Sequence, residues 1–327
     1  MRALQTSLQR HRADAMMTVM VFVWGFHFIV VKDAVGDMDP LTYNAVRFTV
    51  GLPALMLFAL RDRAWLHVSR RDLWLLLVLT LTGPLLYQIG FALGIKRTTS
   101  ANTALLVATM PAWTAFFSIA LGLVEIRRRL LTGIAVTLAG MALVVLSRSE
   151  NGLSLSHDDL VGSALVLGAA MVGGLGNVTS KPVVDRVGGM TMAIWKYIFS
   201  TIGLLAVSTP QLVHFSSDTL PLHTVPNVLY SGILSGVGGY MAVHIALKDI
   251  GPTRTSAYFN YNPIVAGAAG VLILGEPLTA GLLIGGALTL WGVSVVRHNT
   301  YMRKKASADP VQPPTPTPEC SPRTIAG

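Results

Sequence analysis

The sequence is poor in charged residues and in cysteine. Of its 327 residues, 13% are Asp, Glu, Lys or Arg and 52% are apolar. The mean hydropathy of +0.57 lies well above that of soluble globular proteins. Because Cys320 is the only cysteine, a disulfide framework and a cysteine metal site are excluded within one chain. This composition predicts a polytopic membrane protein.

Motifs for catalysis and cofactor binding are missing as well. No Gly-rich phosphate loop ends in Lys followed by Ser or Thr, and the eight histidines show no paired metal-ligand spacing. No Asp or Glu lies at the centre of an apolar run, so the sequence does not support a carboxylate proton relay inside the membrane. We expect no cofactor, no bound metal and no enzymatic activity.

Ten apolar runs alternate with short polar segments. At about 1.5 Å per residue, a helix of about 20 residues crosses a bilayer core. The runs fall at residues 14–35, 41–60, 73–95, 99–122, 130–147, 160–180, 189–209, 226–247, 253–275 and 278–296. The prediction is an all-α membrane protein with about ten transmembrane helices.

Lys and Arg concentrate in alternate segments between these runs. Under the positive-inside rule this distribution places both termini in the cytoplasm, and it accounts for the net charge of +9 without nucleic acid. Residues 1–13 are then a cytoplasmic N-terminus, and the Pro-rich residues 303–327 predict a disordered cytoplasmic tail. We expect a multi-pass protein of the bacterial inner membrane, in contact with the lipid bilayer.

The chain contains two related halves. At an offset of 149 residues Arg47 aligns with Lys196, and at an offset of 152 residues Pro111 aligns with Pro263. Since five helices is an odd number, the second half enters the membrane from the opposite side, which gives two inverted five-helix repeats. The repeats are expected at residues 14–147 and 160–298. In secondary transporters of this architecture, the substrate site lies near the midplane, between the repeats.

Two prolines interrupt corresponding helices. Pro111 and Pro263 lack the N–H that a helix requires, so each predicts a helix break, and Asn262 adds a polar group beside the second break. Glu276 and Pro277 follow a glycine and predict a tight turn. In that turn we expect Glu276 to face the positive N-terminus of the last helix.

Several short motifs in this order resemble a known family. They are Trp24-Gly25-Phe26-His27-Phe28 in the first helix, Arg47-Phe48 in the second, and Leu274-Gly275-Glu276-Pro277-Leu278-Thr279 before the last. With the central prolines, they make roughly residues 14–298 similar to the EamA family of the drug/metabolite transporter superfamily. The resemblance implies a ten-helix carrier, and many relatives export amino acids or other small metabolites. The first repeat departs from the pattern, because Glu125 precedes a basic run where the family has Gly-Glu-Arg-Leu.

A charge inside a transmembrane helix is costly, so Arg47 requires an explanation. Its side chain either snorkels or binds a helix carbonyl, or it holds an anionic group of a substrate in its forked donors. Other candidates for cavity lining have polar or aromatic tips near kinked helices, although Trp and Tyr also anchor helices at membrane interfaces. The candidate set is Trp24, His27, Arg47, Tyr87, Asn102, Trp113, Asn177, Tyr240, His244, Tyr258 and Asn262.

These expectations combine into a secondary transporter that exports small amphipathic metabolites, such as amino acids, by alternating access. A carrier of sugar phosphates or nucleotide sugars is the alternative in the same class, and it would need more basic residues in the cavity. A non-transporting membrane sensor and a lipid-acting membrane enzyme are alternatives from other classes. We expect a small-molecule substrate and either a monomer or a homodimer.

Overall fold

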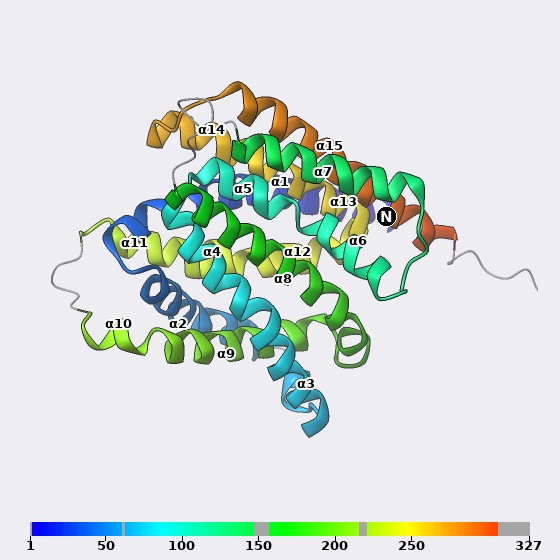
Figure 1. The fold of residues 1–327 in the computed structure, drawn as a ribbon. Helices are drawn as coiled ribbons and strands as arrows, with labels where there is room; N and C mark the ends of the chain where they lie inside the picture. The colour runs from blue at the N-terminus through cyan, green and yellow to red at the C-terminus, as the bar shows by residue number, and fades with distance from the viewer. Residues whose placement is uncertain (1, 61–62, 147–156, 216–220, 307–327) are drawn as a thin grey trace, which may run out of the picture.

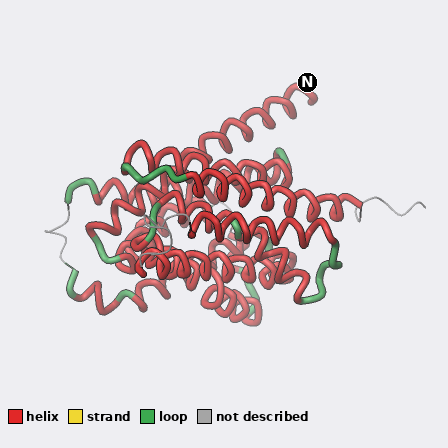
Figure 2. The backbone as a smooth tube through the Cα atoms, turned by 45° about the horizontal axis from the view of Figure 1, so that its top comes forward, coloured by secondary structure: helices red, strands yellow, loops and turns green. Residues whose placement is uncertain are grey.

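In the computed structural model, the described residues are 2–60, 63–146, 157–215 and 221–306. They are nearly all helical, and no β-strand occurs among them (Figure 2). Eight helical segments are long and apolar enough to cross a membrane, and two shorter apolar helices, Phe259–Leu274 and Ala280–Val296, follow them. The predicted all-α fold with about ten transmembrane helices is confirmed.

The first repeat forms five membrane-crossing segments. In chain order they are α1 (Arg2–Asp37); α2 (Pro40–Ala59); α3 (Arg70–Thr80) with the π-helix η2 (Leu81–Leu85) and α4 (Leu86–Arg97); α5 (Ser100–Ala108) with α6 (Met110–Ala120); and α7 (Arg128–Leu146). A short 3-10 helix, η1 (Arg63–Leu66), precedes α3. Residues 2–13 of the expected N-terminal segment extend α1, whose first turns project from the bundle in Figure 2.

The second repeat follows the same plan. It contains α8 (His157–Val187); α9 (Gly189–Val207) with α10 (Thr209–Val213); α11 (Thr224–Leu229) with the π-helix η4 (Tyr230–Gly238) and α12 (Gly239–Asp249); α13 (Gly251–Tyr258) with the 3-10 helix η5 (Phe259–Tyr261) and α14 (Asn262–Leu274); and α15 (Ala280–Ala306). The expected disordered tail overlaps the end of α15, and its residues 307–327 lie outside the described part of the chain.

Both repeats deform their third and fourth segments at corresponding places. The third segment of each repeat contains a π-helix: η2 includes Pro84, and η4 includes five glycine or serine residues. The α-helix of the fourth segment is interrupted just before Pro111 in one repeat and just before Pro263 in the other. π-segments and prolines release backbone carbonyls from the regular helical pattern. Both π-helices also pack against helices of the other repeat, η2 against α8 and α9, and η4 against α1 and α2.

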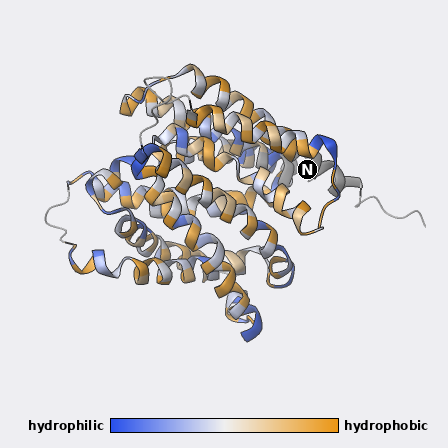
Figure 3. Ribbon diagram, viewed as in Figure 1, coloured by the Kyte–Doolittle hydropathy of each residue, from blue (hydrophilic) through white to orange (hydrophobic). Residues whose placement is uncertain are grey.

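The two repeats interlock instead of standing apart. The third segment of the first repeat packs on the first segment of the second, α4 against α8, and the reciprocal pair is α12 against α1. Figure 1 shows α4 and α8 side by side, and likewise α7 and α15 at the edge of the bundle. Figure 3 shows hydrophobic residues along the helices and hydrophilic residues gathered near helix ends. The middle of the bundle is thus built from both repeats.

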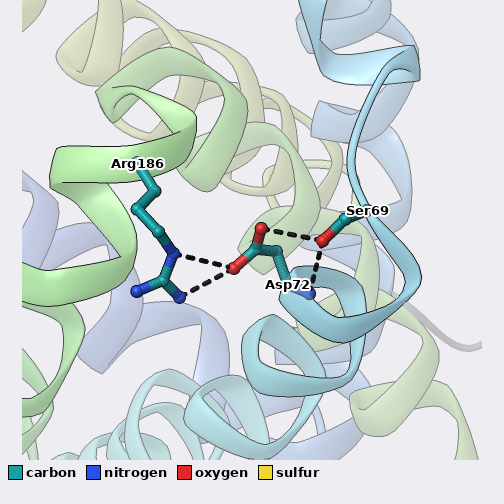
Figure 4. Close-up of polar contacts among 3 residues, drawn as sticks. All are labelled: Ser69, Asp72 and Arg186. Atoms are coloured by element: carbon teal, nitrogen blue, oxygen red, sulfur yellow. Dashed lines mark hydrogen bonds and ion pairs between the residues drawn. The ribbon is translucent and has the colours of Figure 1, made fainter.

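Polar links join the repeats at the helix ends. Arg186 of α8 donates from Nη2 and Nε to Asp72 Oδ1 of α3, at 2.7 and 3.1 Å, and Ser69 holds the other carboxylate oxygen (Figure 4). The corresponding place in the other repeat has Asp37 of α1, which contacts His223 Nε2 at 2.8 Å before α11. In both places a polar contact joins the end of one repeat's first segment to the start of the other repeat's third segment, although the residue types differ.

One end of the interface between the repeats is packed more closely than the other. α5 packs on α14, whereas the pair related to it by the repeat, α13 and α6, makes no comparable contact in the described part of the chain. If both repeats had the same conformation, these two pairs would pack alike. The structure is therefore asymmetric about its internal repeat.

Candidate functional site

Arg47 lies inside the bundle, on α2, with 5% of its surface exposed. Its Nε donates to Asn44 Oδ1 at 2.7 Å, and its Nη2 donates to Gln88 Oε1 of α4 at 2.7 Å. Asn44 Nδ2 in turn donates to the backbone carbonyl of Gln88, at 2.7 Å. These acceptors are neutral, and no Asp or Glu within the described residues lies within ion-pair distance of Arg47. The guanidinium charge is thus buried among neutral groups.

His27 of α1 is the third polar neighbour of Arg47. Its Nε2 lies 3.4 Å from Arg47 Nη1, and its ring stacks on Phe91 with the centroids 6.5 Å apart. The other ring nitrogen, Nδ1, is buried and has no hydrogen-bond partner within the described structure. A buried polar atom without a partner is uncommon and costly, so this nitrogen is available to a bound molecule or water.

Aromatic rings surround the guanidinium. The Arg47 Cζ atom lies 5.8 Å from the Tyr43 ring centroid and 5.2 Å from that of Phe48, within the range of cation–π attraction. Tyr197 stacks on Phe48 at 4.7 Å, and Tyr87 stacks on Phe91 at 5.9 Å. We call Arg47, Asn44, Gln88, His27 and these rings the Arg47 cluster.

Glycines of α8 allow α4 and α6 to pack closely against it. A Cβ on Gly173 would lie 2.8 Å from the Met110 methyl and 3.4 Å from Tyr87 Cδ2, and one on Gly174 would lie 2.7 Å from Trp113 Cβ. Trp113 Nε1 is buried without a hydrogen-bond partner in the described chain. Trp113 Nε1 on α6 is thus a second unpartnered polar atom, after His27 Nδ1. Trp113 and Tyr87 of the Arg47 cluster lie beside adjacent glycines of α8.

Trp24 of α1 reaches the deformed third segment of the other repeat. Its Nε1 donates to the carbonyl of Ser235 in η4 at 3.1 Å, and its ring stacks on Phe259 with the centroids 5.1 Å apart. A Cβ on Gly239 would lie 2.7 Å from the Trp24 ring. Trp24 therefore packs where η4 meets α12 and donates to a carbonyl of the π-helix.

Four other candidates lie outside the Arg47 cluster. Asn177 and His244 are exposed, and Tyr240 is 50% exposed. The fourth, Asn262, lies at the start of α14 beside Pro263, and its Oδ1 is buried without a partner among the described residues.

Two candidates instead fasten helix ends. Tyr258 donates its hydroxyl to Asp14 Oδ1 at 2.9 Å, so it links α13 to α1 and does not join the Arg47 cluster. Asn102 is fully buried and donates to Ser163 Oγ of α8 and to Thr98 Oγ1, both at 2.8 Å. Asn102 Oδ1 is nevertheless buried without a partner among the described residues. That the two residues line a cavity stays a prediction.

The expected partner of Glu276 is corrected by the structure. Its carboxylate accepts hydrogen bonds from the backbone N–H groups of Ser100 and Ala101, at 2.7 and 3.2 Å, and from the Ser100 hydroxyl, at 2.9 Å. It therefore stabilises the N-terminus of α5 and not that of the following helix. α15 begins only at Ala280, so its free N–H groups lie further along the chain. Gly270 leaves room for the carboxylate, since a Cβ there would lie 2.5 Å from Oε2.

Asn44 was missed by the sequence reasoning, which selected Arg47. The signal was available, because residues three apart on a helix share one face and can form a hydrogen bond. The contribution of Gln88 Oε1 could not be found in this way, since it belongs to another helix.

An all-helical membrane bundle with two inverted repeats and a buried cation between aromatic rings is the architecture of a secondary membrane transporter. Residues 11–146 and 160–297 match the model of the EamA-like transporter family, so the chain belongs to that family. The predicted family, the multi-pass membrane character and the transporter function are confirmed.

Relatives resemble the chain over nearly their whole length. An "Uncharacterized transporter" of Archaeoglobus fulgidus is 26% identical over 293 residues, covering 86% of this chain and 96% of that protein. A "Probable amino-acid metabolite efflux pump" of Escherichia coli is 28% identical over 307 residues, covering 90% and 97%. A solved crystal structure that is 18% identical has a TM-score of 0.60 and covers 91% of this chain and 99% of its own, which supports the fold.

Proposed function

We propose that this transporter exports small amphipathic carboxylates, amino acids and their derivatives among them, by alternating access. The observation that supports this most is the burial of Arg47, 5% exposed, among neutral acceptors and aromatic rings. The E. coli relative named for amino-acid metabolite efflux and a Streptantibioticus cattleyicolor relative named "Probable terminal-alkyne amino-acid exporter" support the same substrate class.

Arg47 has donors left for a carboxylate. A guanidinium carries five N–H groups, and the three contacts to Asn44, Gln88 and His27 account for three of them. The remaining donors suit a carboxylate, which an arginine can hold through two hydrogen bonds. The surrounding rings would contact the apolar part of the substrate.

The asymmetry of the repeats supports alternating access. α5 and α14 pack together at one end, while α6 and α13 do not do so at the other. With both termini in the cytoplasm, as the distribution of Lys and Arg favours, the packed end faces away from the cytoplasm. This conformation would accept a metabolite from the cytoplasm. Exchange of the two arrangements between the repeats would release it outside.

The apolar spans and the distribution of Lys and Arg also support a membrane location for the protein. A chain of apolar spans with this charge distribution belongs in the bacterial inner membrane with both termini cytoplasmic. It acts as a carrier and not as an enzyme, as a monomer or a homodimer. Sugar phosphates carry more charge than one buried arginine neutralises, which makes them the weaker candidates.

Transport into proteoliposomes tests the proposal. Purified wild-type protein is expected to give saturable flux of labelled amino acids or their N-acyl derivatives, and Arg47→Gln to abolish it. Lys196→Gln is the matched control, because it removes the charge related to Arg47 by the repeat, and Lys196 Nζ is bound by Ser180 Oγ at 2.6 Å. Absence of flux for every carboxylate in the wild type would overturn the proposal.

A further inference from the structure

We propose that the site prefers carboxylates whose α-nitrogen is uncharged, such as N-acylated amino acids, over free amino acids. This inference rests on the proposed function, and it narrows the substrate class. A free amino acid brings a carboxylate and an ammonium group, which need opposite partners. The arrangement of charges around Arg47 provides for only the first.

The carboxylates in the described part of the chain are committed elsewhere. Those with partners bind groups at helix ends or in turns: Asp14 with Arg254, Asp33 with Asn227, Asp37 with His223, Asp39 with the start of α2, Asp72 with Arg186, Glu125 with Arg127, Asp159 with Thr98, and Glu276 with the start of α5. None of these is part of the Arg47 cluster. An ammonium group bound beside Arg47 would therefore have no carboxylate as a partner.

The two amide oxygens of the cluster are also directed at Arg47. Asn44 Oδ1 and Gln88 Oε1 each accept from the guanidinium at 2.7 Å. The faces of Tyr43 and Phe48, which could attract a cation, already lie against the guanidinium. An α-ammonium is only two bonds from the carboxylate carbon. A substrate held by its carboxylate would thus place a second positive charge within a few ångströms of the first, where the two repel each other.

An acyl group on the α-nitrogen would also find a hydrogen-bond donor. Trp113 Nε1 is a hydrogen-bond donor, is buried, and has no partner in the described chain. Trp113 packs on Gly174, next to the glycine that contacts Tyr87. A carbonyl oxygen on the α-nitrogen would accept from such a donor, whereas an ammonium group cannot accept. With an N-acyl carboxylate bound, the single charge of Arg47 is neutralised and no new charge is added.

The test is a competition series on the wild-type protein in proteoliposomes, so it does not depend on how a variant folds. N-acetyl-L-phenylalanine, L-phenylalanine, L-phenylalaninamide and N-acetyl-L-phenylalaninamide share one side chain and differ in their two charges. We expect N-acetyl-L-phenylalanine to be transported with a half-saturation at least tenfold below that of L-phenylalanine, and the two amides not to compete.

A second variant locates the discrimination. Trp113→Phe is expected to remove most of the preference for the acetylated compound, measured as the ratio of the half-saturation of L-phenylalanine to that of N-acetyl-L-phenylalanine. Equal or tighter half-saturation for L-phenylalanine in the wild type would overturn the inference and leave the proposed function intact. In that case, a weaker half-saturation for L-phenylalanine in Asn262→Ala would assign the ammonium group to the unpartnered Asn262 Oδ1. Failure of both carboxylates to be transported or to compete would overturn the proposed function itself.

Discussion

The carboxylate of Glu276 binds the N-terminus of a helix that begins 176 residues earlier, accepting from the Ser100 N–H at 2.7 Å and the Ser100 hydroxyl at 2.9 Å. The helix dipole and the unpaired N–H groups at that end both favour a negative charge. Glu276 is 9% exposed, so solvent screens these contacts little. The link joins the turn before the last helix of the second repeat to α5 of the first, at the end where α5 and α14 are packed.

Glu276→Gln is expected to loosen this packed end. Hydrogen bonds to a charged group contribute about 1.5–3 kcal/mol, and the amide retains part of this, so a loss of about 1.5 kcal/mol is expected, about a tenfold shift toward the separated arrangement. Labelling of Ala101→Cys with a membrane-impermeant thiol reagent, in a Cys320→Ser background, measures it.

Glu125→Gln serves as the control for Glu276. Glu125 contacts Arg127 at 3.6 Å, and both side chains are mostly exposed, 73% and 60%. Exposed pairs of this kind contribute little. The control should label like the parent protein. If Glu276→Gln also labelled like the parent, the link would not hold the two helices together.

Gly140→Ala is expected to destabilise the contact between α7 and α15. A Cβ there would lie 2.5 Å from the Thr289 backbone nitrogen and 2.7 Å from the Gly285 carbonyl oxygen. Since both neighbours are backbone atoms, the helices must separate, at a cost of about 1–3 kcal/mol. Thermal unfolding in detergent would show a lower midpoint.

Gly168→Ala is the matched substitution, because nothing lies within 4 Å of its Cβ position. It should leave the midpoint unchanged or raise it, since alanine is favoured over glycine in a helix by up to about 1 kcal/mol. Equal effects of the two substitutions would show that close helix approach at Gly140 does not contribute to stability.

Trp113→Phe should separate stability from transport. Its Nε1 has no partner among the described residues, so the substitution removes no hydrogen bond of the empty protein. Because phenylalanine fills less space beside Phe116 and Phe117, we expect a small fall in the unfolding midpoint together with a several-fold weaker half-saturation for acylated substrates. Unchanged half-saturation for acylated substrates would show that this donor does not bind them.

Arg47→Lys should impair binding although it keeps the charge. A lysine has one nitrogen and cannot reach Asn44, Gln88 and a carboxylate in the forked geometry of a guanidinium. We expect half-saturation to rise by about 10- to 100-fold, equivalent to about 1.4–2.7 kcal/mol. Flux measured over a range of substrate concentrations distinguishes this from a lower maximal rate. Unchanged half-saturation would indicate that charge alone is recognised.

Much of the fold could be predicted from local sequence. Apolar runs of bilayer length predicted the helices, because the hydropathy of a span depends on its own residues. The alignment of Arg47 with Lys196 at a fixed offset predicted the repeat. Pro111 and Pro263 likewise indicated where the α-helices of the fourth segments are interrupted. Such features depend on residues near each other in the chain.

The partners of the polar side chains were decided by tertiary structure. Gln88 meets Arg47 across 41 residues, Tyr258 meets Asp14 across 244, and Glu276 meets Ser100 across 176. Sequence alone established that these groups needed partners, because buried polar atoms do. Which partner each one found depended on how the packed helices are placed, and helix packing is set by side-chain shape over the whole bundle.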